Sequence, residues 1–281
     1  MEQIYEKGKP MKFEGRTVLI TGASMGVGAA LARAFAGEGA NLVLLARGEA
    51  KLRELEASLN LPGRVLVAPM DVTDMTAFQT LLGDAAKQFE GLDVLINNAG
   101  YHERGLVEGV DVHQLGQMVD VNLKAPLMAT ALALPYLRQS SQPAVIQVAS
   151  LAGRAAIPGS ATYSATKWGL RMFSLALAEE LRGSGIKIAC VSPGPIDTGF
   201  IMDDIDQVTD LTFSQPLSTA SQVAQVVLDL VTNNRLEQSM PAMSGYLTTL
   251  TYLAPWLGRA VRPLLERKGQ RTKQRLKRER G

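Results

Sequence analysis

The chain has 281 residues, of which 46% are hydrophobic and 20% charged. This composition is ordinary for a globular protein with a large core and leaves one or two domains open. The single cysteine, Cys190, excludes an internal disulfide, and with only two histidines beside it a zinc site is disfavoured. Nothing here argues for an oxidising compartment, so we expect a cytoplasmic location.

The net charge of +2 conceals an uneven distribution. Residues 258–281 hold ten Lys or Arg and two acids, a net charge of +8, which leaves −6 for the rest of the chain. Residues 1–15 have no apolar run, and they predict a polar leader rather than a signal peptide or a membrane anchor.

From residue 16 onward, short apolar runs alternate with segments of helical periodicity. The expected strands are 16–21, 41–46, 64–68, 93–97, 144–149 and 186–191. The expected helices are 29–36, 49–59, 74–89, 111–138 (with Pro126 and Pro135 as candidate interruptions), 162–182 and 220–232. Strands that alternate with helices imply a parallel sheet covered on both faces. The pattern predicts one doubly wound, Rossmann-type α/β domain over 16–235 and a separate segment over 236–281.

A glycine-rich turn, GASMGVG at 22–28, lies between the first strand and the first helix. Its glycines let the backbone turn sharply and approach a pyrophosphate, whose charge then meets the helix N-terminus. Tight turns also need glycine for steric reasons alone. The position between strand and helix favours the phosphate-binding interpretation.

Tyr163 and Lys167 stand four residues apart at the start of a predicted helix, so their side chains share a face. A phenol titrates near pH ~10, and a cation held nearby lowers its pKa toward neutrality. Ser150 follows the strand at 144–149, at the end where open α/β sheets place ligands. A half-exposed tyrosine beside a solvated lysine is the alternative, and the sequence alone does not show that Ser150 and Tyr163 meet.

Seven motifs, in chain order, resemble those of the short-chain dehydrogenase/reductase family. They are TGASMGVG at 21–28, Asp71-Val72, NNAG at 97–100, Asn122, Ser150, YSATK at 163–167 and PGPIDT at 193–198. The resemblance implies a three-layer αβα sandwich with seven parallel strands. It also implies hydride transfer between a nicotinamide cofactor and a carbonyl or secondary alcohol.

The resemblance assigns roles to four catalytic residues. Tyr163 would be the general acid in reduction and the base in oxidation, and Lys167 would lower its pKa and bind the nicotinamide ribose. Ser150 would polarise the substrate oxygen, and Asn122 would hold a water in the proton relay. Taken singly, Asn122 or Asp71 would be interpreted as a capping or turn residue.

The resemblance also outlines a cofactor site. In addition to Tyr163 and Lys167, it includes Gly22, Ser24, Met25, Gly26, Val27 and Gly28 at the phosphates, Asp71, Val72, Asn98, Ala99 and Gly100 around the adenosine, and Pro193, Gly194, Ile196 and Thr198 at the nicotinamide end.

The end of the second strand bears on the choice of cofactor. Enzymes that use NAD place an acid there, whereas this chain has Arg47, with Lys51 one helical turn on. Arg47 can bind a 2′-phosphate through paired hydrogen bonds, and Lys51 adds charge. A solvated arginine is the alternative, and Met25 stands where many NADP-dependent relatives have a basic residue. The missing acid favours NADP(H).

Substrate contacts are placed by the resemblance at Ser150, Leu151, Ile157, Tyr101, His102 and Phe200. The apolar residues of the loop at 199–218 suit a hydrophobic carbonyl compound or alcohol, although buried loop anchors would look the same. Neither His102 nor His113 matches a family motif, and we expect surface positions for both.

The resemblance implies a homodimer or homotetramer that pairs through the helices at 111–138 and 162–182. Arg47, Lys51 and the uncharged C-terminal segment also resemble the 3-ketosphinganine reductase branch. The rival class is a non-catalytic cofactor-binding or membrane-associated scaffold. All four catalytic residues are present, which favours the enzyme.

Residues 238–258 carry no charge, but Pro241, Pro255 and many polar residues argue against a transmembrane span. Aromatic and apolar residues next to the +8 stretch are typical of a surface anchor for anionic membranes. The alternative is an arm over the substrate cleft or a neighbouring subunit, followed by a disordered tail. The charge of −6 on the remaining chain argues against nucleic-acid binding.

Overall fold

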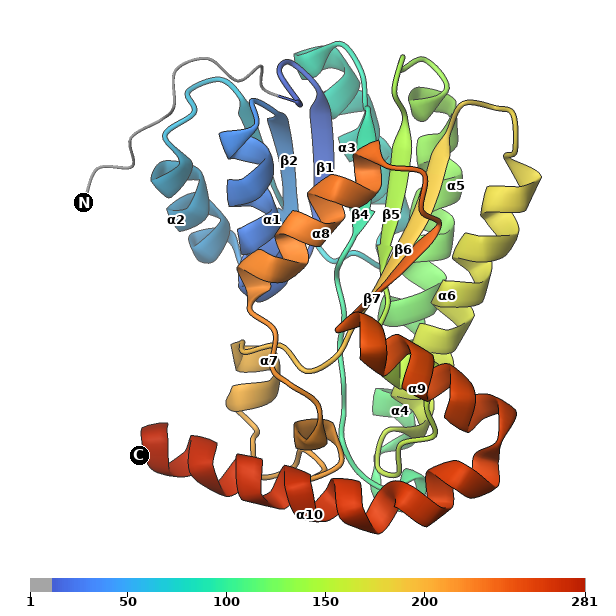
Figure 1. Ribbon diagram of the computed structural model, residues 1–281. Helices are drawn as coiled ribbons and strands as arrows, with labels where there is room; N and C mark the ends of the chain where they lie inside the picture. Colours follow the sequence, from blue (N-terminus) through green and yellow to red (C-terminus); the bar gives the residue numbers. More distant parts are fainter. Residues whose placement is uncertain (1–11, 281) are drawn as a thin grey trace.

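The computed structural model describes residues 12–280 (Figure 1). Seven parallel strands form one sheet in the order β3-β2-β1-β4-β5-β6-β7. Their bounds are β1 Thr17–Thr21, β2 Asn41–Ala46, β3 Val65–Pro69, β4 Val94–Asn97, β5 Ala144–Val148, β6 Lys187–Pro193 and β7 Glu237–Met240. The strand order reverses between β1 and β4, the switch point at which doubly wound sheets bind ligands. The predicted fold class is confirmed.

Two helical layers cover the sheet and give it two hydrophobic cores. One layer contains α1 Gly26–Gly37, α2 Glu49–Leu59 and α8 Ala220–Thr232. The other contains α3 Met75–Phe89, α5 Ala125–Leu137 and α6 Ala161–Glu180. Because side chains alternate along a strand, Val18 and Ile20 of β1 enter the first core and Leu19 enters the second.

The helical stretch expected at 111–138 is irregular just before Pro126 and continues through Pro135. It consists of α4 Val112–Val119, a π-helical segment η2 Asp120–Lys124, and α5. Pro126 comes two residues after the π segment in a continuous helix, so its missing N–H leaves a carbonyl of the preceding turn without its helical partner. The π segment contains Asn122.

At the amino end, residues 1–11 of the expected leader lie outside the described residues. Phe13, also within the leader, is buried and packs edge-on against Phe35 with the ring centroids 4.8 Å apart. This residue is therefore part of the first core.

The segment at 236–281 begins with β7, which pairs with β6 and completes the sheet. It continues as α9 Ala242–Leu253 and α10 Pro255–Arg280. The basic stretch is therefore helical, whereas one expectation was a disordered tail. In Figure 1, α10 runs along the bottom of the molecule, below α7 Gly199–Met202. Within residues 12–280, no helix is long and apolar enough to cross a membrane.

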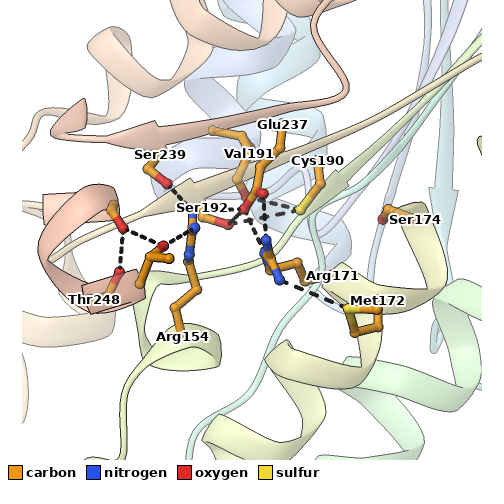
Figure 2. Close-up of polar contacts among 12 residues, drawn as sticks. Arg154, Arg171, Met172, Ser174, Cys190, Val191, Ser192, Glu237, Ser239 and Thr248 are labelled. Carbon is orange, nitrogen blue, oxygen red and sulfur yellow. Dashed lines mark hydrogen bonds and ion pairs between the residues drawn. The ribbon is translucent and has the colours of Figure 1, made fainter. Parts of the chain in front are cut away.

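A cluster of charges ties β7 to its surroundings (Figure 2). The Glu237 carboxylate accepts two hydrogen bonds of 2.7 Å from Arg171 of α6 and one of 3.0 Å from Arg154. Arg154 belongs to the short helix η3 Leu151–Arg154 and also donates to Ser239 and Thr249. The three charged side chains are only 14–17% exposed. The carboxylate thus joins β7, α6 and η3, and Arg154 extends the cluster to α9.

We expect Glu237→Gln to lower the free energy of unfolding by about 2 kcal/mol, because both arginines lose their buried counter-charge. Burial alone raises the pKa of Glu237, but hydrogen bonding and charge from Arg171, with help from Arg154 and Ser192, outweigh it and lower the pKa below 4.5. This contribution is therefore complete above about pH 4.5 and is lost as the pH falls through the depressed folded-state pKa.

Urea unfolding of the wild type and of Glu237→Gln, at neutral and at acidic pH, measures these effects. Glu180→Gln, at an exposed position on α6, is the matched control. Equal stability of the two variants at neutral pH would contradict the role of the cluster.

Candidate active site

A cavity of about 2110 Å³ opens along the carboxyl edge of the sheet. Every cofactor and substrate residue expected from the sequence lines it, from the glycine-rich turn after β1 to Thr198 and Phe200 beyond β6. Ser150, Tyr163 and Lys167 line it as well. Asn122, the remaining expected catalytic residue, is fully buried in η2. The parallel sheet thus brings distant motifs to one place.

The turn between β1 and α1 is shaped for close backbone approach. A Cβ on Gly28 would overlap the carbonyl oxygen of Gly22, and a Cβ on Gly22 would lie 2.9 Å from the Cα of Ala99. Helix α1 begins without a capping side chain at Met25 and without an acid in its first turn. Its first N–H groups and dipole therefore remain available for an anion, which fits the pyrophosphate of a dinucleotide.

Two exposed cations stand at the far end of this cavity, where β2 ends. Arg47 and Lys51 line the cavity and form no ion pair among the described residues. Asp71 accepts hydrogen bonds from the backbone and hydroxyl of Thr73 at 2.9 and 2.7 Å, so it also closes its own turn. Burial alone raises the pKa of Asp71, but these bonds and the nearby charge of Arg47 lower it overall. The acid thus stays ionised beside the cations.

Tyr163 lies in the first turn of α6 and is only 9% exposed. Burial raises the pKa of its phenol, while the nearby Ser150 hydroxyl and the charge of Arg104 oppose the rise. The Ser150 hydroxyl also accepts from the N–H of Ala152 at 3.1 Å. The structure therefore brings Ser150 and Tyr163 together, which the sequence left open.

Lys167 lies one turn after Tyr163 and is also buried. Its ammonium donates to the carbonyl oxygen of Val148 at 2.9 Å and lies 5.9 Å from the centroid of the Tyr163 ring. Burial lowers the pKa of Lys167 to about 8. The expected lowering of the phenol pKa by Lys167 is not found, because the pKa of Tyr163 lies above 10 and burial dominates it.

Asn122 acts on the backbone that borders the cavity. Its amide nitrogen donates to the Tyr101 carbonyl at 2.7 Å and to the Thr166 hydroxyl at 3.3 Å, and its oxygen accepts from the Tyr101 N–H at 2.7 Å. Both amide hydrogens are thus used within the protein. The side chain positions Tyr101 against α6, and a bound water would need another group of this segment.

The surface position expected for His102 is wrong. Its ring stacks on Tyr163 with the centroids 4.1 Å apart, and burial, with the charges of Arg104 and Lys167, lowers its pKa to about 3. His102 is therefore neutral at physiological pH. His113 is exposed, as expected.

Arg104 was not predicted as a site residue either. It connects the segment after β4 to α7. It donates to the Phe200 carbonyl at 2.6 Å, lies over the Phe200 ring at 5.5 Å and pairs with Asp204 at 3.8 Å. The centroid of the Phe200 ring lies 6.3 Å from that of Tyr163. Arg104 thus holds α7 over the phenol. The run of polar residues after NNAG is the one sequence signal that could have indicated His102 and Arg104.

The C-terminal helices form the opposite wall of the cavity, as expected for an arm over the substrate cleft. Their contribution is largely apolar, although Arg259 and Arg262 also line it. The apolar side chains include Leu247, Leu250, Tyr252, Leu257, Val261 and Leu265. A ligand that reaches from the cofactor turn past Tyr163 would therefore meet an apolar surface.

Fold and site together define a dinucleotide-dependent oxidoreductase of the doubly wound class. The family model for short chain dehydrogenases matches residues 16–208. The chain is 35% identical over 223 residues to L-fucose dehydrogenase of Mus musculus, covering 76% of this chain and 80% of the relative. It is 33% identical over 225 residues to the ketoacyl reductase HetN of Nostoc sp., covering 79% and 77%.

Solved structures agree with these relatives. A short-chain dehydrogenase/reductase from Brucella melitensis, described as a glucose/ribitol dehydrogenase, superimposes with a TM-score of 0.76 at 27% identity. The match covers 82% of this chain and 96% of that one. The protein belongs to the short-chain dehydrogenase/reductase family, which uses a nicotinamide cofactor, NAD or NADP.

We expect Gly28→Ala to weaken cofactor binding at least about tenfold, because the new methyl group must displace the turn that would hold the pyrophosphate. Gly37→Ala, in the last turn of the same helix with open space around it, is the control and should leave affinity unchanged. Fluorescence titration with NADPH and NADH checks both variants. Wild-type affinity in Gly28→Ala would contradict the assignment of the turn.

Proposed function

We propose that the protein is an NADP(H)-dependent oxidoreductase that interconverts a hydrophobic carbonyl compound and its secondary alcohol. The observation that carries this proposal is the meeting of Tyr163 and Ser150 in a cavity that runs from the cofactor turn to an apolar wall. When bound, the nicotinamide supplies or accepts the hydride. Residues of the glycine-rich turn, the ends of β2, β4 and β6, and Lys167 would hold the cofactor.

Tyr163 is proposed to move the proton. In reduction its phenol donates a proton to the carbonyl oxygen while the Ser150 hydroxyl stabilises the charge that develops there, and in oxidation the proton returns. The raised pKa keeps the phenol protonated at neutral pH, which is the form needed for reduction. His102, stacked on the ring, limits its rotation.

The apolar wall supports a hydrophobic substrate. Leu151 and Ile157 lie on one side, Phe200 on α7 closes the site, and α9 and α10 add the leucines described above. Of the two relatives, one is named for a sugar and the other for a ketoacyl compound. The lining favours an extended apolar substrate of the second kind.

A cofactor-binding or membrane-associated scaffold without turnover is the alternative. The arrangement of Tyr163, Ser150 and Lys167 supports the enzyme, since a scaffold needs no proton donor at this place. Self-association through α4, α5 and α6 and a cytoplasmic location stay predictions, and light scattering at micromolar concentration would test the former.

Tyr163→Phe should lower the turnover number with NADPH and a panel of carbonyl compounds at least about a hundredfold, because the proton donor is removed. NADPH affinity should change little, since the ring and its packing remain. An unchanged rate would refute the catalytic role of Tyr163. Wild-type protein that binds NADPH but turns over no member of the panel would instead support the scaffold.

Arg47→Ala should weaken NADPH binding at least about tenfold and leave NADH binding unchanged, because a charge-assisted bond to the 2′-phosphate contributes about 1.5–3 kcal/mol. Arg33→Ala, at an exposed position on α1 outside the cavity lining, controls for the loss of one positive charge. Fluorescence titration of each variant with both cofactors decides the matter. Tighter binding of NADH than NADPH by the wild type would overturn the cofactor assignment.

A further inference from the structure

Helix α10 has an inner face fixed to the loop that follows α7. Gly269 is buried there, and a Cβ on it would overlap the Asp210 carbonyl oxygen. Lys273 donates to the carbonyl oxygens of Asp206 and Val208 at 3.1 and 2.7 Å. Leu276 joins a small apolar cluster formed by Ile201, Val208 and Phe213. The helix therefore lies against the protein in one orientation, and its outer face is defined.

That outer face is apolar at its start and basic beyond it. Trp256 and Leu264 are exposed near its start. Exposed basic residues then follow at helical spacing of three or four positions: Arg267, Lys268, Arg271, Arg275 and Arg278. Among the described residues, α10 has two acidic side chains. Glu266 pairs with Arg262, and Glu279 pairs with Arg275. Arg267, Lys268, Arg271 and Arg278 have no ion-pair partner among the described residues, so the face is strongly cationic.

Helix α9 carries an exposed apolar stripe directly before this face. Its members recur at helical spacing, are 48–74% exposed, and comprise Met243, Tyr246, Leu247, Leu250 and Leu253. Trp256 follows three residues later, so the apolar stripe leads into the basic one. Side chains of this size in one exposed stripe mark an interaction surface.

We propose that the outer faces of α9 and α10 form a docking surface for an anionic lipid bilayer. Apolar side chains beside a dense row of arginines and lysines suit an interfacial helix, in which the first enter the acyl boundary and the second meet anionic headgroups. A second copy of the chain fits poorly, because a two-fold contact would bring like charges together. Lipid supplies both the apolar phase and the opposite charge.

The surface is continuous with the cavity. Leu247 and Leu250 belong to the exposed stripe and also line the cavity wall. The cavity therefore borders the face on which the bilayer would lie. The route of the substrate rests on the proposed function. Given that function, the substrate is a carbonyl compound or alcohol that partitions into membranes and enters the cavity from them.

Co-sedimentation of the full-length protein with phosphatidylcholine vesicles, with and without phosphatidylglycerol, tests the docking surface. We expect binding that requires phosphatidylglycerol, weakens with salt and falls at least about tenfold in Arg267→Glu/Arg271→Glu. Arg33→Glu/Lys87→Glu, with the same change in net charge at exposed sites on α1 and α3, should bind as the wild type does. Protein left in the supernatant with both vesicles, or equal loss in both variants, would overturn the proposal.

Trp256 gives a second readout, because the chain has only two tryptophans. In a Trp168→Phe background, its emission should shift to shorter wavelength on addition of anionic vesicles, and an unchanged spectrum would contradict insertion. If the charge reversal dissociates an oligomer and vesicles do not bind, the face is an interface between copies instead. If short duplex DNA abolishes vesicle binding and itself binds more tightly, the face is a nucleic-acid site.

Turnover of a water-soluble carbonyl compound separates this proposal from the proposed function. Both charge-reversal variants should keep it, since neither pair of residues lines the cavity. Vesicle binding without any turnover would count against the enzyme alone. Turnover without vesicle binding would count against the docking surface alone.

Discussion

The parallel sheet imposes the constraint on which the rest of the molecule depends. Both of its faces are covered by helices, and its seven strands run in one direction, so the carboxyl edge is where loops from distant parts of the chain meet. Gly22, Ser150 and Thr198 follow three different strands and line one cavity for this reason. The Glu237 cluster holds β7 in the sheet, and the C-terminal helices follow β7 in the chain.

Burial governs the chemistry at that edge more than any single charge does. It raises the pKa of Tyr163, and it lowers the pKa values of Lys167 to about 8 and of His102 to about 3. At neutral pH the phenol is therefore protonated, the imidazole neutral and the ammonium charged. As the pH rises above about 8, the lysine loses its charge before the phenol ionises. Under the proposed function, this is the state in which Tyr163 can donate a proton.

The sequence allowed prediction of those features that are written locally. Helix α8 was placed at its observed bounds, and Thr219 and Gln222 form a capping box at its start. The glycine-rich turn, Tyr163 and Lys167 were predicted as site residues because their spacing has a geometric meaning, and they line the cavity. Strand β7 was not, since Glu-Gln-Ser-Met lacks apolar alternation and is held by β6 and the arginines of the cluster. The stacking of His102 on Tyr163 depends on the path of a loop, which no periodicity encodes.

The C-terminal helices show how a late segment can complete a cavity that earlier segments begin. Lys273 and Gly269 contact residues about sixty positions earlier in the chain, so only the folded structure connects α10 with the loop beyond Phe200. That loop and α9 both border the cavity, so α10 supports one side of it through these contacts. The residues that would meet a bilayer and those that hold this loop lie on opposite faces of one helix. A bilayer on the outer face would therefore leave the contacts that hold the loop in place.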